Sequence, residues 1–168
     1  MSDIINKIAS ECRDILTKDQ SSGSPQKILK VVEKVICLPE LIGECFPQTV
    51  TEERRVLFED QQFGFCICRH VYLDGKNGGA HDHGPTWAIY GQVSGQTEMS
   101  DWEFCGEAKN GEPRRVQVVR TYKLLPGKAH LYNIGDIHSP RIKSGSQVLR
   151  IEGQNTDYVD RTPMTAIC

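Results

Sequence analysis

Residues 75–83 read Gly-Lys-Asn-Gly-Gly-Ala-His-Asp-His, and residues 127–138 read Gly-Lys-Ala-His-Leu-Tyr-Asn-Ile-Gly-Asp-Ile-His. His81 and His83 are two residues apart, and on a β-strand such a pair shares one face, so both imidazoles can reach one ion. The glycines that precede His81 allow the chain to turn tightly there. Taken alone, the pair is a weak signal, and two ordinary histidines near a turn are the simpler interpretation.

The sequence around these stretches predicts a mainly β domain. From about Thr51 the segments are short, rich in β-branched and aromatic residues, and separated by Gly, Pro, Asn and Asp. Many short strands at this spacing favour a β-sandwich or barrel. We expect strands near Arg54–Glu59, Phe63–Tyr72, Thr86–Val93, Gln96–Trp102, Gln117–Leu124, Ala129–Ile134, Pro140–Lys143 and Gln147–Gly153. Turns are expected at Gly75–Gly79, Gly106–Pro113 and Pro126–Gly127, with a polar tail at Asp157–Cys168 lying over the surface.

The N-terminal part has a different, helical periodicity. Apolar residues in 3–18 recur at helix spacing, and a second apolar stripe begins at Ile28, after Ser24 and Pro25, which favour a helix start. Pro39 ends that stripe, and a short helix is expected through Phe46. We therefore predict a helical segment, residues 1–48, packed on a barrel domain, residues 49–168, as a single structural unit.

Composition excludes several classes of partner. The chain has 168 residues and a formal net charge of -2, so no strong attraction to nucleic acid or anionic lipid is expected. It contains neither a membrane-length apolar run nor a secretory signal pattern, which predicts a cytoplasmic protein that does not bind membranes. The seven cysteines are odd in number and scattered, as in a reducing compartment. We interpret Cys66 and Cys68 as two small buried hydrophobes.

The two histidine stretches resemble the two motifs of the cupin superfamily. The first has Gly75 six residues before His81 and a closing Gly95, and the second has Gly127 followed by a tight turn and His138. The resemblance covers roughly residues 54–153. It implies a cupin double-stranded β-helix, a jelly-roll barrel, in which His81, His83 and His138 bind one metal ion.

The usual glutamate ligand of cupins is missing from this pattern. It would stand four or five residues after the second histidine, where this chain has Trp87 and Ala88. The resemblance therefore implies three neutral imidazole ligands and about three open positions on an octahedral ion. Open positions suit an iron that binds substrate and O2 side by side, although imidazole also suits zinc, copper and nickel.

A three-histidine cupin of this kind is similar to the thiol dioxygenases, which include cysteine dioxygenase. The family has helices before the barrel and a His-Asp-His motif, as at His81–His83, and a later Asp-Trp pair, here Asp101 and Trp102. It also places an arginine 26 residues before the first histidine, which is Arg55 here. In the family this arginine grips the substrate carboxylate, and a guanidinium suits that role.

Two departures from the thiol dioxygenases concern the pocket. Ala88 stands where animal enzymes carry a crosslinked cysteine, so no such crosslink is expected. The Ser-x-His-x-Tyr triad of the family is replaced by residues 149–153, Leu-Arg-Ile-Glu-Gly. We expect His70, Tyr72 and Tyr90 to face inward and to rebuild the pocket.

Other polar residues near the pocket are open to simpler interpretations. His130 and Tyr132 face the interior or the surface with equal expectation, and His70 is also compatible with a structural role. Arg150 and Glu152 share one face of the last strand, and we interpret them as a solvated or interfacial charge pair.

The resemblance implies a non-haem Fe(II) dioxygenase that converts a small thiol-bearing carboxylic acid and O2 to a sulfinate. Its partners would be that small substrate and O2, with a homodimer as a further possibility. One alternative is another metal-dependent cupin enzyme: a dioxygenase of a diketone or hydroxyketone, a lyase or an isomerase using iron, zinc or nickel. The second alternative is a non-catalytic cupin that binds a metal or small ligand, for which Arg55 would not be needed in a pocket.

Overall fold

The structure is a computed structural model that describes residues 2–107 and 109–167. Cys168, one of the cysteines noted above, lies outside the described residues. Within them the helices are α1 (Asp3–Lys18), α2 (Ser24–Val35), α3 (Pro39–Cys45) and the short 3-10 helix η1 (Thr156–Tyr158). The strands are β1 (Arg54–Glu59), β2 (Cys66–Tyr72), β3 (Lys76–Asn77), β4 (Ala88–Ser94), β5 (Thr97–Phe104), β6 (Arg114–Leu124), β7 (Ala129–Tyr132), β8 (Ile137–Ile142), β9 (Ser146–Glu152) and β10 (Met164–Ala166).

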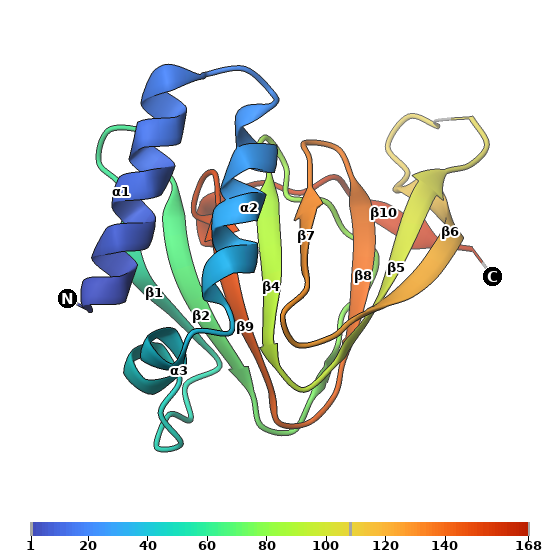
Figure 1. The fold of residues 1–168 in the computed structure, drawn as a ribbon. Helices are drawn as coiled ribbons and strands as arrows, with labels where there is room; N and C mark the ends of the chain where they lie inside the picture. Colours follow the sequence, from blue (N-terminus) through green and yellow to red (C-terminus); the bar gives the residue numbers. More distant parts are fainter. Residues whose placement is uncertain (1, 108, 168) are drawn as a thin grey trace.

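The strands form two five-stranded sheets that face one another, with orders β1-β2-β9-β4-β7 and β10-β6-β5-β8-β3. Strands distant in the sequence are neighbours in space, since β9 lies between β2 and β4. The pairs are antiparallel except β10 with β6. Figure 1 shows the two sheets curling toward one another as a jelly-roll. The predicted fold class, a mainly β jelly-roll barrel with short N-terminal helices, is confirmed.

The strands β2, β4 and β9 are covered on both faces, which explains their nearly continuous burial. Alternate residues of a strand point to opposite sides of the sheet. On β2, Ile67 and Val71 join the apolar cluster under the helices, whereas Tyr72 joins the cluster inside the barrel. On β9, Leu149 packs outward and Val148 packs inward in the same way.

The helices α1 and α2 cover the outer face of the first sheet (Figure 1). Their buried side chains, among them Ile5, Ile8, Ile28 and Val32, share one apolar cluster with the outward residues of the sheet. The approach is closest at Gly91 of β4, where an added Cβ would lie 2.7 Å from Val32 Cγ1. A side chain at position 91 would therefore push α2 away from the barrel.

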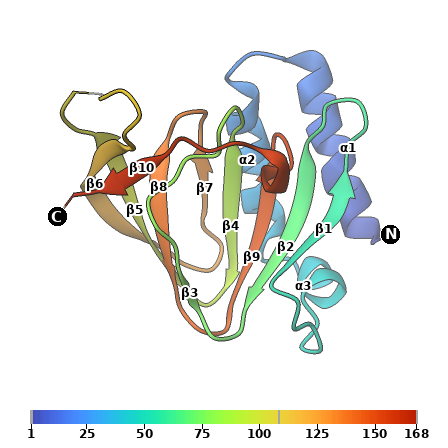
Figure 2. The same cartoon turned by 180° about the vertical axis from the view of Figure 1, so that it is seen from behind.

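Three strand assignments differ from the sequence prediction. β8 begins at Ile137 and not at Pro140, because Ile137 and His138 pair with Trp102 and Asp101 of β5. β3 lies within the predicted turn at 75–79, where it pairs with β8. β10 lies in the polar tail and pairs in parallel with β6 through backbone groups. Figure 2 shows this C-terminal segment crossing from η1 to the outer edge of the second sheet.

No helix in the described part of the chain is long and apolar enough to span a membrane.

Candidate metal centre

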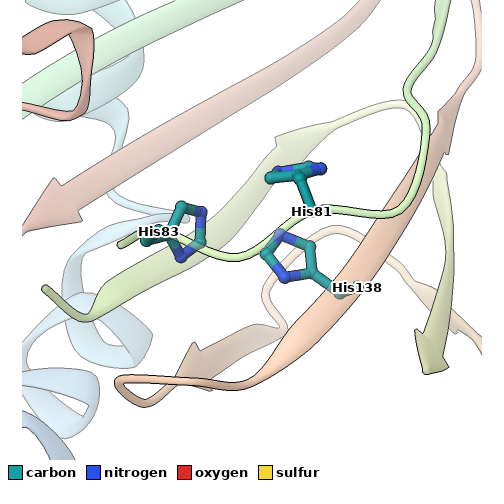
Figure 3. A group of neighbouring side chains, drawn as sticks. All are labelled: His81, His83 and His138. Carbon is teal, nitrogen blue, oxygen red and sulfur yellow. The ribbon is translucent and has the colours of Figure 1, made fainter. Parts of the chain in front are cut away.

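Three histidines from two distant parts of the chain converge inside the barrel. The ring centroids of His81 and His138 are 4.5 Å apart, and those of His83 and His138 are 4.7 Å apart. One ring nitrogen from each residue lies within 4.8 Å of the other two, so the three can hold one metal ion. Figure 3 shows the three rings gathered around a common space, with His138 on β8 and the other two on the segment that precedes β4.

A backbone bridge and the side chain of Asp82 position the histidines. His81 forms an isolated β-bridge with His138, but His83 lies in an irregular segment, so the expectation that the pair sits on one regular strand is wrong. Asp82 fixes this segment, because its Oδ1 accepts hydrogen bonds from the backbone N–H groups of Gly84 and Thr162. The tail thus clamps the segment and directs Asp82 toward Gly84 and Thr162.

The three imidazoles are neutral at neutral pH, which is the form that binds metals. Burial lowers the pKa of His81 to about 4, although a hydrogen bond to Gly79 acts in the opposite direction. Burial likewise holds the pKa values of His83 and His138 well below the usual range, and the charge of Arg150 adds to the effect.

The hydrogen bonds of the rings also fit a metal. His81 Nδ1 lies 2.9 Å from the Gly79 carbonyl oxygen, which can only accept, so Nδ1 carries the proton and the Nε2 lone pair is free. The buried Nδ1 atoms of His83 and His138 have no hydrogen-bond partner within the described residues. Three neutral nitrogen donors without a carboxylate suit a divalent transition metal such as iron or zinc.

A polar chain supports the ring of His138. The Tyr132 ring stacks on His138 with centroids 3.8 Å apart, which resolves its predicted orientation as inward. Tyr132 Oη lies 2.7 Å from Tyr122 Oη, and Tyr122 donates to Asp101. His130 is only half-buried beside Tyr132. Tyr132 therefore locks the ring of the third histidine.

A cavity of about 410 Å³ opens beside the histidines and includes His81 and Tyr90 in its wall. His70 and Tyr72 also line it, as the sequence predicted, and Tyr72 Oη lies 3.1 Å from His70 Nδ1. Burial, together with the charges of Arg150 and Arg54, holds the pKa of His70 well below its ordinary value, so His70 is neutral and forms a hydrogen bond with the Tyr72 hydroxyl.

The charges around the cavity favour an anion. Four cationic side chains line it, against two carboxylates; these residues are Arg54, Lys76, Arg150 and Arg161, and Glu53 and Asp157. The apolar part of the wall comes from Leu124, Pro140, Ile142 and Val148. Such a cavity suits a small molecule that has both an apolar body and a negative group.

The structure corrects the arginine predicted from the sequence. Arg55 is exposed and is not among the residues that line the cavity. Its neighbour Arg54 lines the cavity and pairs directly across the strands with His70, so the two side chains share the inner face. The sequence did contain a signal for Arg54, because His70 and Tyr72 were predicted to face inward and Arg54 pairs with His70.

Arg150 and Glu152 are also placed differently from the prediction. Both are buried on the inner face of β9, where Arg150 Nη2 lies 2.8 Å from Glu152 Oε1. The Arg150 guanidinium carbon lies 4.3 Å from the centre of the Tyr90 ring. Burial acts to raise the pKa of Glu152, but Arg150 and the Thr156 N–H outweigh it and keep that pKa below the ordinary value. The pair is therefore an internal charge pair and not a solvated one.

A second group of potential ligands lies at the end of this charge network. Cys66 and Cys68 are buried as predicted, with sulfur atoms 3.6 Å apart, and Cys66 Sγ lies 3.5 Å from Glu152 Oε2. Arg54 Nη2 lies 3.5 Å from Cys68 Sγ and 3.2 Å from Glu152 Oε2. Because this guanidinium already brings a positive charge to the group, the histidines form the favoured metal site.

Neither a family model nor a curated protein matches this sequence. Among solved structures it is similar to KdgF from Halomonas sp., with 17% identity over 67% of this chain and 91% of the other, and a TM-score of 0.48. The cupin domain of Cnp3 from Schizosaccharomyces pombe has 10% identity over 66% and 67%, with a TM-score of 0.48. The DMSP lyase DddQ from Ruegeria pomeroyi has 14% identity over 66% and 50%, with a TM-score of 0.44. At such values the site is best interpreted from the chain's own geometry.

Proposed function

We propose that this protein is a metal-dependent cupin enzyme, specifically a non-haem Fe(II) dioxygenase that converts a small thiol-bearing carboxylic acid to its sulfinate. The observation that carries the proposal is the convergence of His81, His83 and His138 beside a cavity that is lined by His81 and by arginines. Neutral imidazoles without a carboxylate leave the ion its positive charge, which favours an anionic donor such as a thiolate.

The bound iron would supply the oxygen chemistry, in which R–S⁻ and O2 combine to R–SO2⁻ and both oxygen atoms are retained. The protein's own residues bind and orient the substrate. Arg150 presents a buried guanidinium to the cavity, and Arg54 stands beside it, so the substrate carboxylate would lie against β9 and β1. Because strand pairing fixes the backbone of β9, the Arg150 guanidinium loses little conformational entropy when it binds the carboxylate.

The remaining cavity residues control water and protons. Leu124, Ile142 and Val148 give the wall an apolar part that displaces water from the substrate body. The Tyr72 hydroxyl, held by neutral His70, is a proton donor or acceptor within the wall. This pair lies on β2, next to β9, the strand whose residues replace the triad of the thiol dioxygenases, and it offers a hydrogen-bonding substitute.

The test is oxygen uptake by iron-loaded protein with matched thiols: one that carries a carboxylate and its primary amide. We expect O2 and sulfinate in a one-to-one ratio with the acid and much slower turnover of the amide. Arg55→Ala is the control, and it should behave as the wild type, because Arg55 lies outside the cavity. Protein that holds iron yet oxidises no thiol would instead favour another cupin reaction, such as that of a lyase or isomerase.

A further inference from the structure

Tyr90 holds its hydroxyl group between two of the three histidines. Its oxygen lies 3.0 Å from His83 Nε2 and 3.3 Å from His138 Nε2. Tyr90 belongs to the inward-facing residues of β4, two positions after Ala88, and its ring is buried. The histidine nitrogens thus have a fourth potential donor atom beside them, supplied by a rigid strand.

These distances match those between neighbouring ligands of one ion. Nitrogen and oxygen ligands lie about 2.0–2.2 Å from a transition-metal ion. Two such ligands at an angle between about 90° and 109° are about 2.8–3.6 Å apart, from the same bond lengths. Both measured distances fall in this range.

We propose that Tyr90 is a fourth ligand, whose phenol oxygen binds the same ion as His81, His83 and His138. The inference rests on the proposed metal site and specifies its composition. A tyrosine oxygen takes the place of the cupin glutamate, from a position two residues further along β4 than Ala88. The phenol proton leaves to the cavity, which Tyr90 lines.

Two further observations support ligation. If both Nε2 atoms keep the lone pairs that ligation needs, a neutral phenol with one proton can donate to only one of them, whereas an oxygen bound to a shared ion beside them needs to donate to neither. In addition, burial raises the pKa of Tyr90, and the Arg150 guanidinium, 4.3 Å from the centre of the Tyr90 ring, acts in the opposite direction and favours a phenolate. Within residues 2–107 and 109–167, the Tyr90 oxygen has no hydrogen-bonding neighbour other than the two histidines.

Ligation by Tyr90 changes what the centre can accept. With four protein ligands, an octahedral ion keeps two open positions and not three. Because O2 needs one of these positions, a substrate can bind the ion through one donor atom only, and its carboxylate must be held by the protein. This division agrees with the buried arginine beside the cavity.

The test uses iron-loaded protein oxidised to Fe(III), because a ferric phenolate gives an intense visible charge-transfer band and enhanced tyrosine vibrations in resonance Raman spectra. We expect both signals in the wild type and neither in Tyr90→Phe, which should keep its iron with affinity about 10- to 100-fold weaker. Tyr132→Phe is the matched control: Tyr132 stacks on His138, but its oxygen contacts Tyr122, so the band should persist.

The outcomes separate this inference from the proposed function. Wild-type protein that holds about one iron per chain but lacks both signals would overturn ligation by Tyr90 and leave the proposed metal site standing. Signals that survive in Tyr90→Phe would do the same. Wild-type protein that binds no iron, zinc or nickel would overturn the metal site itself. The wild-type spectrum decides the question even if the variant does not fold.

Discussion

The backbones of His81 and His138 pair directly, each N–H donating to the other's carbonyl oxygen at 3.0 Å. This bridge depends on no side chain, so it brings two of the imidazoles together before any ion binds. The third, His83, follows His81 by two residues and is clamped through Asp82 and Thr162. The site is therefore preformed, because folding of the chain brings the three imidazoles together before any ion binds.

A preformed site predicts that removing one ligand abolishes metal binding without unfolding the barrel. We expect His138→Gln to retain the strand pairing of β8 and to bind Fe(II) or Zn(II) at least about 100-fold more weakly than the wild type. Metal content after dialysis and competition with a coloured chelator measure this. His70→Gln, a change at a buried histidine of the same cavity, should leave affinity nearly unchanged. Equal losses in both variants would contradict the assignment.

The sequence was sufficient for the fold and for the histidines, because both depend on local spacing. Glycines at fixed distances from His81 and His138 mark turns, and alternation along β2 and β4 correctly placed His70, Tyr72 and Tyr90 at the cavity. Strand β10 was missed because it pairs through backbone groups, for which the polar tail carries no signal.

The arginines show where local reasoning fails. Arg54 and Arg55 are adjacent, so an error of one residue in the prediction selects an arginine that faces the solvent in place of the one that lines the cavity. Arg150 and Glu152 carry charges that normally indicate solvent, and only the packing of β9 between β2 and β4 shows that both are buried. The contact of Tyr90 with two histidines likewise depends on the closure of the barrel and not on sequence spacing.

Gly95, which closes the first histidine motif, is predicted to be intolerant of a side chain. Its φ is +71°, and an added Cβ would lie 2.7 Å from the Ser146 Cα. Gly145 has a φ of +77° but open space around it, so it provides a matched control. In urea unfolding, Gly145→Ala should lose about 1–2 kcal/mol of unfolding free energy from backbone strain alone. Gly95→Ala should lose clearly more unfolding free energy than Gly145→Ala. Equal losses would show that β9 moves aside at no cost in free energy.

The stability of the metal-free protein should fall in acid, in part through His70. The pKa of His70 lies well below its ordinary value of 6.5, since burial and the charges of Arg150, Arg54 and Lys76 oppose protonation. Below about pH 6.5 the unfolded state therefore takes up a proton that the folded state does not, and the unfolding free energy falls. The contribution of one such group approaches about 1.4 kcal/mol per pH unit.

The His70→Gln variant isolates this contribution. Glutamine can still accept the Tyr72 hydrogen bond but takes up no proton on unfolding. Urea unfolding of wild type and variant from pH 7 down to about pH 5 should give a shallower slope for His70→Gln, by up to about 1.4 kcal/mol per pH unit. Equal pH slopes for the wild type and His70→Gln would mean that His70 is protonated to the same extent in the folded and unfolded states.

The ion pair between Arg150 and Glu152 predicts a strong coupling in stability. Both side chains are buried, so removing one leaves a charge in the interior that water cannot reach. Arg150→Met leaves Glu152 with Arg54 as its remaining charged partner, and we expect a loss of about 3–5 kcal/mol in unfolding free energy. Arg55→Met, which changes an exposed arginine on the neighbouring edge strand, should change it by less than about 0.5 kcal/mol.

The double variant Arg150→Met/Glu152→Gln tests whether the loss comes from the uncompensated charge. Because it removes both charges, most of the stability lost in Arg150→Met should return. Chemical denaturation of the wild type, both single variants (Arg150→Met and Glu152→Gln) and the double variant yields the coupling energy. The folded double variant also lacks the guanidinium that faces the cavity, so its preference for a thiol acid over the matched amide should shrink. A double variant that stays as unstable as Arg150→Met would show that packing against Tyr90, and not the charge of Glu152, holds Arg150 in place.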